Sequence, residues 1–179
     1  MDASSAYQDS LPISSENLLA HLDEAGLSYS RMDHIPLRTV ADSKQVRDGF
    51  LSAADGGGHI KNLYLRDKKK QNYLVVLQED AELELKFVAE KIGANRLSFG
   101  SADRLLENLG VRPGAVTPLS MINGVQKQVQ LFMDASLREK TLLYMHPLVN
   151  DRTVGMAPAS LEAFLASLGA EYHWIDFSE

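Results

Sequence analysis

The sequence predicts an α+β fold in a single domain, with a mixed, largely antiparallel sheet of about six or seven strands flanked by helices. Three observations support this prediction. Segments typical of strands and helices follow one another without strict βαβ alternation. No internal repeat, low-complexity tract or inter-domain linker interrupts the chain. Its length of 179 residues suits one domain with a substantial hydrophobic core.

The first elements expected are a tail and a helix. Residues 1–13 show no periodic pattern, so we expect them to form a flexible N-terminal tail ahead of a domain that spans 14–179. Ser14 or Ser15 can cap a helix, because a serine side chain accepts hydrogen bonds from the free N–H groups of the first turn. Leucines then recur at helical spacing until Gly26 ends the helix.

The remaining elements follow from local pattern and composition. Strands are indicated by alternating, β-branched and aromatic residues, and helices by apolar residues three or four positions apart. Ser101 is expected to cap one helix, and Gly93 and Gly110 are expected to end two of them. The expected strands are 28–34, two strands of a hairpin within 56–77, then 129–134, 141–147, 152–156 and 171–177. The expected helices after the first are 40–53, 81–94, 101–110 and 157–170.

Composition excludes several classes of protein. The chain has no cysteine, which rules out disulfides, thiolate nucleophiles and Cys-ligated metals. No apolar run approaches the length of a membrane span, and the N-terminus lacks the pattern of a signal peptide, so we expect a cytoplasmic protein without membrane contact. The net charge of −6 means that any nucleic acid must be bound through a local basic patch.

The common catalytic motifs are also absent. There is no H-E-x-x-H or G-x-S-x-G pattern, and the five histidines show no metal-ligand spacing, so we expect neither a metal nor a cofactor. The Gly-rich stretch at 55–58 leads into a strand, whereas a phosphate-binding P-loop leads into a helix and ends in Gly-Lys-Ser/Thr.

Lys61 and Asn62 stand at the start of an expected strand. Because side chains alternate between the two faces of a strand, Lys61 shares a face with Leu63 and Leu65, and that face should be buried. The simpler interpretation is a lysine whose ammonium extends to solvent at the strand end. The functional interpretation is a lysine at the edge of a cleft that holds an anion.

The turn of the hairpin is strongly basic. Between Lys61 and Asn72 the basic residues outnumber the acidic ones by five to one, in a chain that is acidic overall. A solvated turn explains this pattern, and so does a contact with nucleic-acid phosphates. The candidates for such a contact are Arg66, Lys68, Lys69 and Lys70.

Two further segments carry candidate ligand-binding groups. The stretch "GVRPGAVTPL" forms a loop ordered by prolines, in which Gly114 can bring bare backbone N–H groups close to a ligand. Pro118 restricts the backbone conformation of Thr117, the residue before it. The stretch "MHPLVND" places His146 at a strand end, with Asn150 close behind. A lone histidine in such a position is more often a structural residue than a catalytic one.

Taken in order, these segments resemble one family. "KNLYLRDKK" followed by "YLVVL", then "GAVTP" and "HPLVN" are similar to the free-standing aminoacyl-tRNA editing domains of the YbaK/ProX group, which are related to the insertion domain of bacterial prolyl-tRNA synthetase. The resemblance extends from about Ser15 to Phe177. Within the group, the sequence looks most like the ProX-type deacylases that act on mischarged Ala-tRNA(Pro).

This resemblance implies a fold and a reaction. The fold is a mixed sheet flanked by helices, and the reaction is hydrolysis of the ester between a wrong amino acid and the 3′ adenosine of tRNA(Pro). The family's suspected mechanism is substrate-assisted, with a ribose hydroxyl next to the ester doing the work of a protein base. The expected partners are the acceptor end of tRNA(Pro) and, transiently, prolyl-tRNA synthetase or an elongation factor, without DNA.

The resemblance also implies roles for individual residues. Lys61 matches the functional lysine that engages the tRNA 3′ end, and Asn62 accompanies it. The backbone of Gly114 and Ala115 matches the loop that holds the aminoacyl-adenosine, although many relatives have serine at the position of Ala115. His146 matches the histidine that lines the amino-acid pocket. Pro118 and Asn150 are further candidates for substrate contacts.

Two alternatives stay open at this point. A tRNA- or nucleotide-binding module without catalytic activity would need the same lysine, basic turn and ordered loop. A deacylase of the same family could also act on Cys-, Ser- or Thr-tRNA, because the sequence does not define the volume of the pocket.

Overall fold

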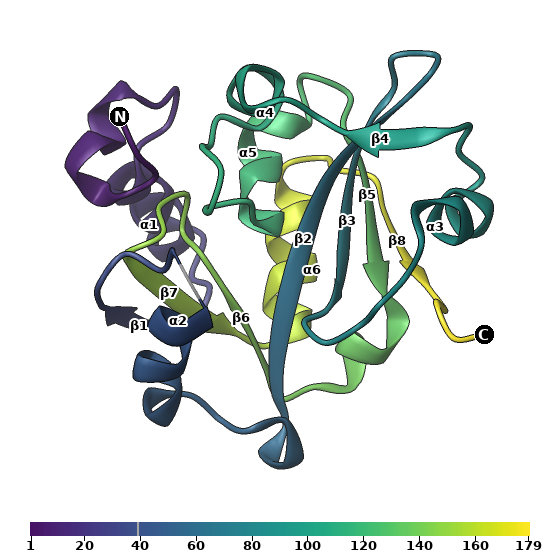
Figure 1. Ribbon diagram of the computed structural model, residues 1–179. Coiled ribbons are helices and arrows are strands. Elements are labelled where there is room, and N and C mark those ends of the chain that lie inside the picture. The colour runs from purple at the N-terminus through teal and green to yellow at the C-terminus, as the bar shows by residue number, and fades with distance from the viewer. Residues whose placement is uncertain (39) are drawn as a thin grey trace.

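The protein folds around one mixed sheet that helices cover on both faces (Figure 1). The computed structural model describes residues 1–38 and 40–179, without the side chains of residues 40 and 44. The strands that it describes are β1 (Ser30–Asp33), β2 (Gly57–Asp67), β3 (Asn72–Gln78), β4 (Leu97–Phe99), β5 (Gln130–Asp134), β6 (Leu142–Met145), β7 (Arg152–Met156) and β8 (Tyr172–Ile175). Their order in the sheet is β1-β7-β6-β2-β3-β5-β8, and β4 pairs with β2.

The sheet combines parallel and antiparallel pairs of strands. The pairs β1–β7, β6–β7, β2–β3 and β2–β4 are antiparallel. The pairs β2–β6, β3–β5 and β5–β8 are parallel. The expected mixed, largely antiparallel sheet flanked by helices is therefore confirmed.

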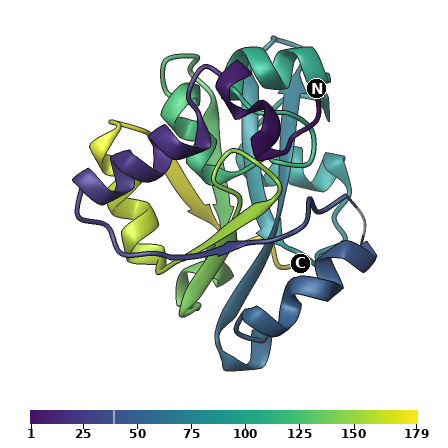
Figure 2. The same ribbon diagram turned by 90° about the vertical axis from the view of Figure 1, so that its left-hand side faces the viewer.

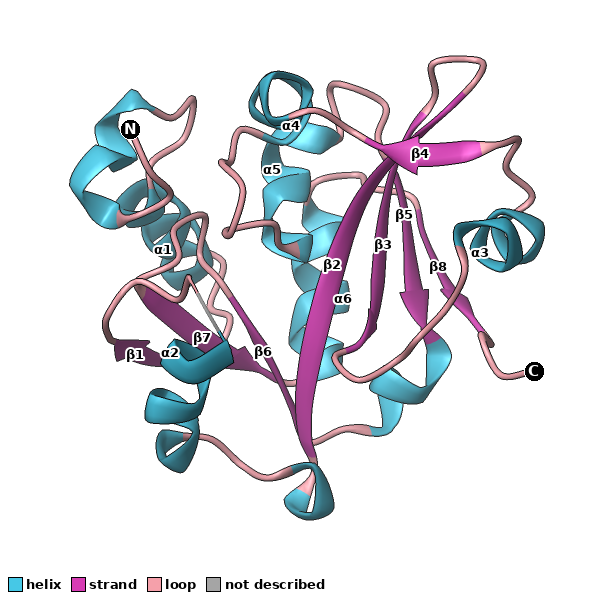
Figure 3. Cartoon of the chain, in the orientation of Figure 1, coloured by secondary structure: helices cyan, strands magenta, loops and turns pink. Residues whose placement is uncertain are grey.

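The helices are short and lie on the sheet or at its ends (Figure 3). The α-helices described are α1 (Ser15–Glu24), α2 (Val40–Val46), α3 (Leu85–Ile92), α4 (Ala102–Leu109), α5 (Met121–Gly124) and α6 (Pro158–Ser167). The 3-10 helices are η1 (Ser5–Ser10), η2 (Arg47–Gly49), η3 (Ala53–Asp55), η4 (Pro118–Ser120) and η5 (Ala135–Glu139). None of the helices in the described ranges combines the length and the apolar character that crossing a bilayer requires.

Each face of the sheet has its own hydrophobic cluster. On one face, leucines of α1, α4 and α6 pack on alternate residues of the strands, among them Tyr64 of β2 and Val76 of β3. On the other face, Val88 of α3 packs with Leu65 of β2 and Leu77 of β3. The pleat of β2 and β3 thus divides neighbouring residues between two clusters.

One edge of β2 is only partly paired. Along this edge β6 pairs with β2 at Gly57–His59, and β4 pairs with it at Leu65–Asp67. Between these two pairings, the edge at 60–64 has no neighbouring strand in the described sheet. Figure 1 shows β6 diverging from β2 toward α1 along this stretch. A gap of this kind in a sheet leaves room for a ligand.

Sequence and structure differ at a few elements. Strand β4 and the one-turn helix α5 were not expected, and the helix expected over 40–53 is divided into α2, η2 and η3. The serine caps are confirmed, since Ser14 and Ser101 accept hydrogen bonds from the N–H groups of Asn17 and Arg104. Both Gly93 and Gly110 adopt positive φ after their helices, as glycine does most readily.

The N-terminal residues 1–13 differ from the expected flexible tail. They contain η1, and the carbonyl of Ala3 accepts a hydrogen bond from the N–H of Asn150. Ser5 donates to the carboxylate of Asp151 through its hydroxyl and its backbone N–H. Figure 2 shows this segment beside the loop that follows β6. In the structure, the segment therefore packs against the rest of the domain.

Candidate functional site

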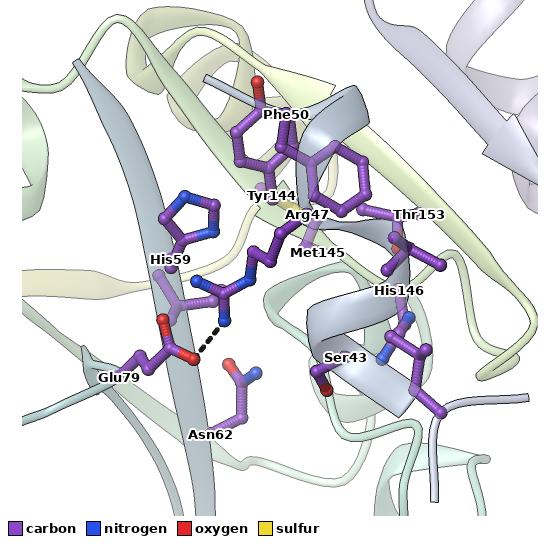
Figure 4. Close-up of a pocket in the computed structure, with 13 residues that line it drawn as sticks. Ser43, Arg47, Phe50, His59, Asn62, Glu79, Tyr144, Met145, His146 and Thr153 are labelled. Carbon is purple, nitrogen blue, oxygen red and sulfur yellow. Dashed lines mark hydrogen bonds and ion pairs between the residues drawn. The ribbon is translucent and has the colours of Figure 1, made fainter. Parts of the chain in front are cut away.

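A cavity of about 130 Å³ opens beside the partly paired edge of β2 (Figure 4). At about 30 Å³ per water molecule, this is space for roughly four waters, which is the scale of a small aminoacyl group. Strands β2, β6 and β7 form its floor, and α2 and η2 cover it. Its lining consists of Leu37, Ser43, Val46, Arg47, Phe50, His59, Ile60, Asn62, Glu79, Tyr144, Met145, His146 and Thr153.

His146 follows β6 and contributes a neutral imidazole to this cavity. Burial lowers the pKa of His146 below its ordinary value of 6.5. Its Nδ1 lies 2.8 Å from the carbonyl oxygen of Arg152. A carbonyl can only accept, so Nδ1 carries the hydrogen, and Nε2 keeps a lone pair as a hydrogen-bond acceptor. His146 is therefore suited to accept a hydrogen bond from a substrate.

Asn62 reaches the same cavity from β2. Its Oδ1 atom is buried and has no hydrogen-bond partner among the described residues. Figure 4 shows the amide of Asn62 directed toward the side of the cavity where Arg47 meets Glu79. A buried amide oxygen without a partner costs free energy, which a ligand that donates a hydrogen bond would recover. Asn62 is thus a plausible contact for a donor group of a substrate.

Arg47 and Glu79 form an ion pair at the rim of the cavity, drawn as the dashed line in Figure 4. Arg47 belongs to η2, and Glu79 follows the last residue of β3. The pair joins the segment that covers the cavity to the sheet below it. Beside the pair, Phe50, His59 and Tyr144 form an aromatic wall, with His59 and Tyr144 stacked at 5.3 Å between ring centroids.

A second, wider cavity of about 860 Å³ adjoins the first. The two cavities share Arg47, Phe50, His59 and Glu79 in their linings. A small inner cavity with a wider outer one suits a ligand with a small end group on a larger body. An amino acid esterified to a terminal adenosine has this shape.

Lys61 lies on the opposite face of β2 from Asn62. Its Cα pairs with Leu77, a member of the cluster beneath α3, and its ammonium donates a hydrogen bond to the carbonyl of Ala81. It is therefore not among the residues that line the cavity. The expected shared face with Leu63 and Leu65 is confirmed, and the ammonium is directed to the chain that follows Glu79.

The structure brings Gly114 and Asn150 together. A Cβ atom added to Gly114 would lie 3.6 Å from Nδ2 of Asn150, and Gly114 has a φ of +96°. Oδ1 of Asn150 is buried and lacks a partner within the described chain. The backbone carbonyl of Asn150 accepts from Leu37, which lines the cavity. This loop therefore adjoins the cavity through Leu37 without lining it.

The other residues of the loop are more enclosed. Ala115 is fully buried, and its backbone N–H donates to the carbonyl of Arg112 at 3.0 Å. Pro118 begins η4 and is buried. Across residues 1–38 and 40–179, the N–H of Gly114 has no acceptor. Of the two backbone donors expected here, Gly114 is the one that stays open to a ligand.

The basic turn lies at the other end of β2. Lys68, Lys69 and Lys70 are exposed at the β2–β3 turn, and Nε of Arg66 is buried without a partner in the described part of the chain. At roughly 3.3 Å per residue, Lys68 stands about 20 Å along the strand from Asn62. At this distance the three lysines of the turn do not reach the cavity.

Several cavity residues were not anticipated from the sequence. His59 follows a Gly-rich stretch that resembles a phosphate loop only in composition, and no motif in the sequence surrounds Glu79. Arg47, Phe50 and Tyr144 come from segments without a recognisable motif. Only the clustering of polar and aromatic residues near the ends of the expected strands and helices could have indicated that these residues line a cavity.

Over the described residues, no group of three or more histidines, aspartates or glutamates gathers closely enough to hold a metal ion. The cavity lining itself combines polar side chains, one ion pair and aromatic surface.

Comparison with known proteins agrees with these features. The model of the aminoacyl-tRNA editing domain family matches residues 34–164. The prolyl-tRNA editing protein ProX of Acetoanaerobium sticklandii is 32% identical over 160 residues, which cover 89% of this chain and 94% of that protein. The prolyl-tRNA synthetase associated domain-containing protein 1 of Xenopus laevis is 33% identical over 159 residues, or 86% and 91% of the two chains.

A solved structure shows the same fold at lower sequence identity. The crystal structure of a candidate trans-editing enzyme for prolyl-tRNA synthetase superposes with a TM-score of 0.64 and 18% identity. The match covers 90% of this chain and 96% of that one. The family model, the relatives and the fold agree, and the chain belongs to the aminoacyl-tRNA editing domain family.

Proposed function

We propose that this protein is a trans-editing hydrolase that deacylates mischarged tRNA(Pro), with Ala-tRNA(Pro) as its main substrate. The observation that carries this proposal is the small cavity lined by Asn62 and His146, which has the scale of an aminoacyl group and opens into a wider one. ProX, which spans nearly the same length, is a prolyl-tRNA editing protein. The acceptor end of tRNA(Pro) is the partner that follows from this reaction.

The amino acid enters the inner cavity, and the terminal adenosine occupies the outer one. Small side chains fit, and the ring of proline is excluded by size, because a rigid cavity rejects an oversized group more strongly than an undersized one. Exclusion of proline protects the correctly charged tRNA. Asn62 and His146 orient the aminoacyl group through their acceptor atoms.

Hydrolysis is assisted by the substrate itself. The ribose hydroxyl next to the ester is held within reach of the reacting centre by covalent geometry, so it replaces a protein base at little entropic cost. The resemblance assigns the developing oxyanion to the backbone of the Gly114 loop, which adjoins the cavity without lining it, so the N–H of Gly114 can serve as this donor only when the ester extends from the cavity toward the loop. A well-placed donor of this kind contributes roughly 2.7–4 kcal/mol. A terminal adenosine that lacks this hydroxyl is expected to bind and resist hydrolysis.

Lys61 contributes by holding the chain after β3. Its ammonium binds the carbonyl of Ala81, and this contact fixes the position of Glu79 at the cavity rim. The lysines of the β2–β3 turn bind tRNA phosphates about 20 Å away along the strand. Prolyl-tRNA synthetase or an elongation factor would meet the protein transiently through the shared tRNA.

The test is a panel of purified tRNAs(Pro) charged with alanine, cysteine, serine, threonine or proline and incubated with the protein. The proposal predicts rapid release of alanine and no release of proline. A binding module without catalytic activity would leave all five esters intact or protect them. Preferred release of cysteine, serine or threonine would keep the reaction and change the substrate, whereas rapid release of proline would contradict an editing role.

A further inference from the structure

The inner cavity is rich in hydrogen-bond acceptors. Oδ1 of Asn62 is buried and unpaired in the described structure, and Nε2 of the neutral His146 carries a lone pair. His59 also lines the cavity, and its Nε2 donates a hydrogen bond to the carbonyl of Leu51, 2.8 Å away. The acceptor atoms of Asn62 and His146 suit a ligand that donates hydrogen bonds.

The cavity lining also offers one place where a positively charged donor would bind. Arg47 is the only lysine or arginine among the lining residues that the structure describes, and it is paired with Glu79. Lys61 is turned away and bound to a backbone carbonyl. The carboxylate of Glu79 is therefore the charged group to which a cation entering this cavity would bind.

The ion pair can exchange its cation at little cost. The side chains of Arg47 and Glu79 are 37% and 43% exposed. Ion pairs this accessible to solvent contribute only about 0–1 kcal/mol, because water screens them. A cation that reaches Glu79 from within the cavity, where Asn62 also supplies an acceptor, can replace Arg47 without a large penalty.

We propose that Glu79 and Asn62 bind the α-ammonium of the esterified amino acid. The inference rests on the proposed function and adds a specificity to it: the substrate must be an ester with a free α-amino group. Esters whose nitrogen is acylated, as in a peptidyl-tRNA, lack the cation and are spared. Arg47 holds Glu79 in place until the ammonium arrives and then releases it to the ligand.

The test compares Ala-tRNA(Pro) with lactyl-tRNA(Pro), in which a hydroxyl of similar size replaces the ammonium. The value of kcat/KM is measured for both esters with the wild-type protein, Glu79→Gln, and Glu82→Gln as a matched control. Glu82 is exposed and makes no ion pair within the described residues, so the control removes a nearby charge outside the cavity. Each rate is divided by the uncatalysed hydrolysis of the same ester.

The expected result is a preference for Ala-tRNA(Pro) that is about 10- to 150-fold larger in the wild type than in Glu79→Gln, since a hydrogen bond to a charged group is lost. The control keeps the wild-type preference. A purely structural role of Glu79 would lower both rates together and leave the preference unchanged, which would overturn the inference.

The wild-type protein alone provides a second check that does not depend on the variant's folding. Equal acceleration of both esters by the wild type would overturn the inference and leave the proposed function standing. Failure of the wild type to hydrolyse Ala-tRNA(Pro) at all would overturn both.

Discussion

Lys61 and Asn62 are neighbours in sequence and lie on opposite faces of β2. On the face of Lys61, the strand packs into a closed cluster beneath α3, and the ammonium is bound to the carbonyl of Ala81. On the face of Asn62, the sheet opens into a cavity, and the amide oxygen has no partner in the described structure. One side chain completes the fold, and the other keeps an acceptor atom available to a ligand.

Lys61 and Asn62 therefore have different roles, although they belong to one sequence motif. The dipeptide at the start of β2 looks like one ligand-binding unit in sequence, yet the pleat sends its two side chains apart. Polar groups satisfied within the protein contribute to stability, whereas unsatisfied ones at a cavity contribute to binding. Substitutions on the two faces should therefore affect stability and activity in different proportions.

Asn62→Ala should produce the largest change in activity. Removing the amide should lower kcat/KM for Ala-tRNA(Pro) by about 10- to 150-fold, because a hydrogen bond to the charged substrate is lost. The free energy of unfolding should stay equal or rise slightly, since the amide oxygen that is removed had no partner. Deacylation kinetics and urea unfolding of the same preparation measure both quantities. A large loss of stability would assign Asn62 to the fold.

Lys61→Met should lower kcat/KM by less than Asn62→Ala does, and it should also lower the free energy of unfolding. Methionine keeps the apolar stem and removes the ammonium, so the contact with Ala81 is lost and Glu79 becomes less well positioned. We expect a loss of about 1 kcal/mol of stability, because the contact is partly screened by solvent, and about a tenfold lower kcat/KM. Full activity loss in a variant of unchanged stability would instead show that Lys61 contacts the substrate directly, as the resemblance implied.

The exposed lysines of the β2–β3 turn should affect binding and leave the chemical step unchanged. In a variant with Lys68, Lys69 and Lys70 replaced by glutamine, each lost phosphate contact should reduce the slope of log affinity against log salt by about 0.7–0.9. The value of kcat at saturating tRNA should remain that of the wild type, since the turn lies far from the cavity. An unchanged slope would identify the turn as a solvated surface.

Replacing His146 should have the smallest effect, and this effect should appear in the pH dependence of the free energy of unfolding. Burial lowers its pKa in the folded protein below 6.5, so the unfolded chain binds the proton more readily. The free energy of unfolding should therefore fall as the pH drops from about 6.5 toward the lowered pKa of the folded state. His146→Asn should lack this part of the pH dependence. Thermal unfolding of both proteins across this range gives the comparison, and identical curves would contradict the assignment.

The sequence predicted the fold well because its signals are local. Alternating residues in β2 and β3, serine caps at Ser14 and Ser101, and closing glycines such as Gly93 each act within a few residues. Strand β4 was missed because three residues carry too little pattern, and its pairing with β2 depends on the tertiary fold. The N-terminal segment has no periodic pattern, and its sequence alone does not reveal the contacts of Ala3 with the rest of the domain.

The site was predicted less completely because a cavity is a tertiary feature. Asn62 and His146 were found through motifs, and the structure brings them together. Glu79 follows a strand as many surface residues do, and Arg47 lies in a helical segment without a motif, so neither position could be recognised before folding placed them at one rim. The alternation of side chains along a strand predicts that Lys61 and Asn62 point to opposite faces. It does not predict which of the two faces borders the cavity.

The most direct test of the account is to locate the ligand on one face of β2. The probe is an alanyl-adenosine in which a 3′ amide replaces the ester and prevents hydrolysis, and the readout is the ¹H–¹⁵N NMR spectrum of the protein during titration. The account predicts that backbone signals of the cavity residues and the side-chain amide of Asn62 shift with one saturable binding constant, while signals of α3 and of Leu63 stay in place. Shifts concentrated around Lys61, Ala81 and α3, with the amide of Asn62 unchanged, would contradict it.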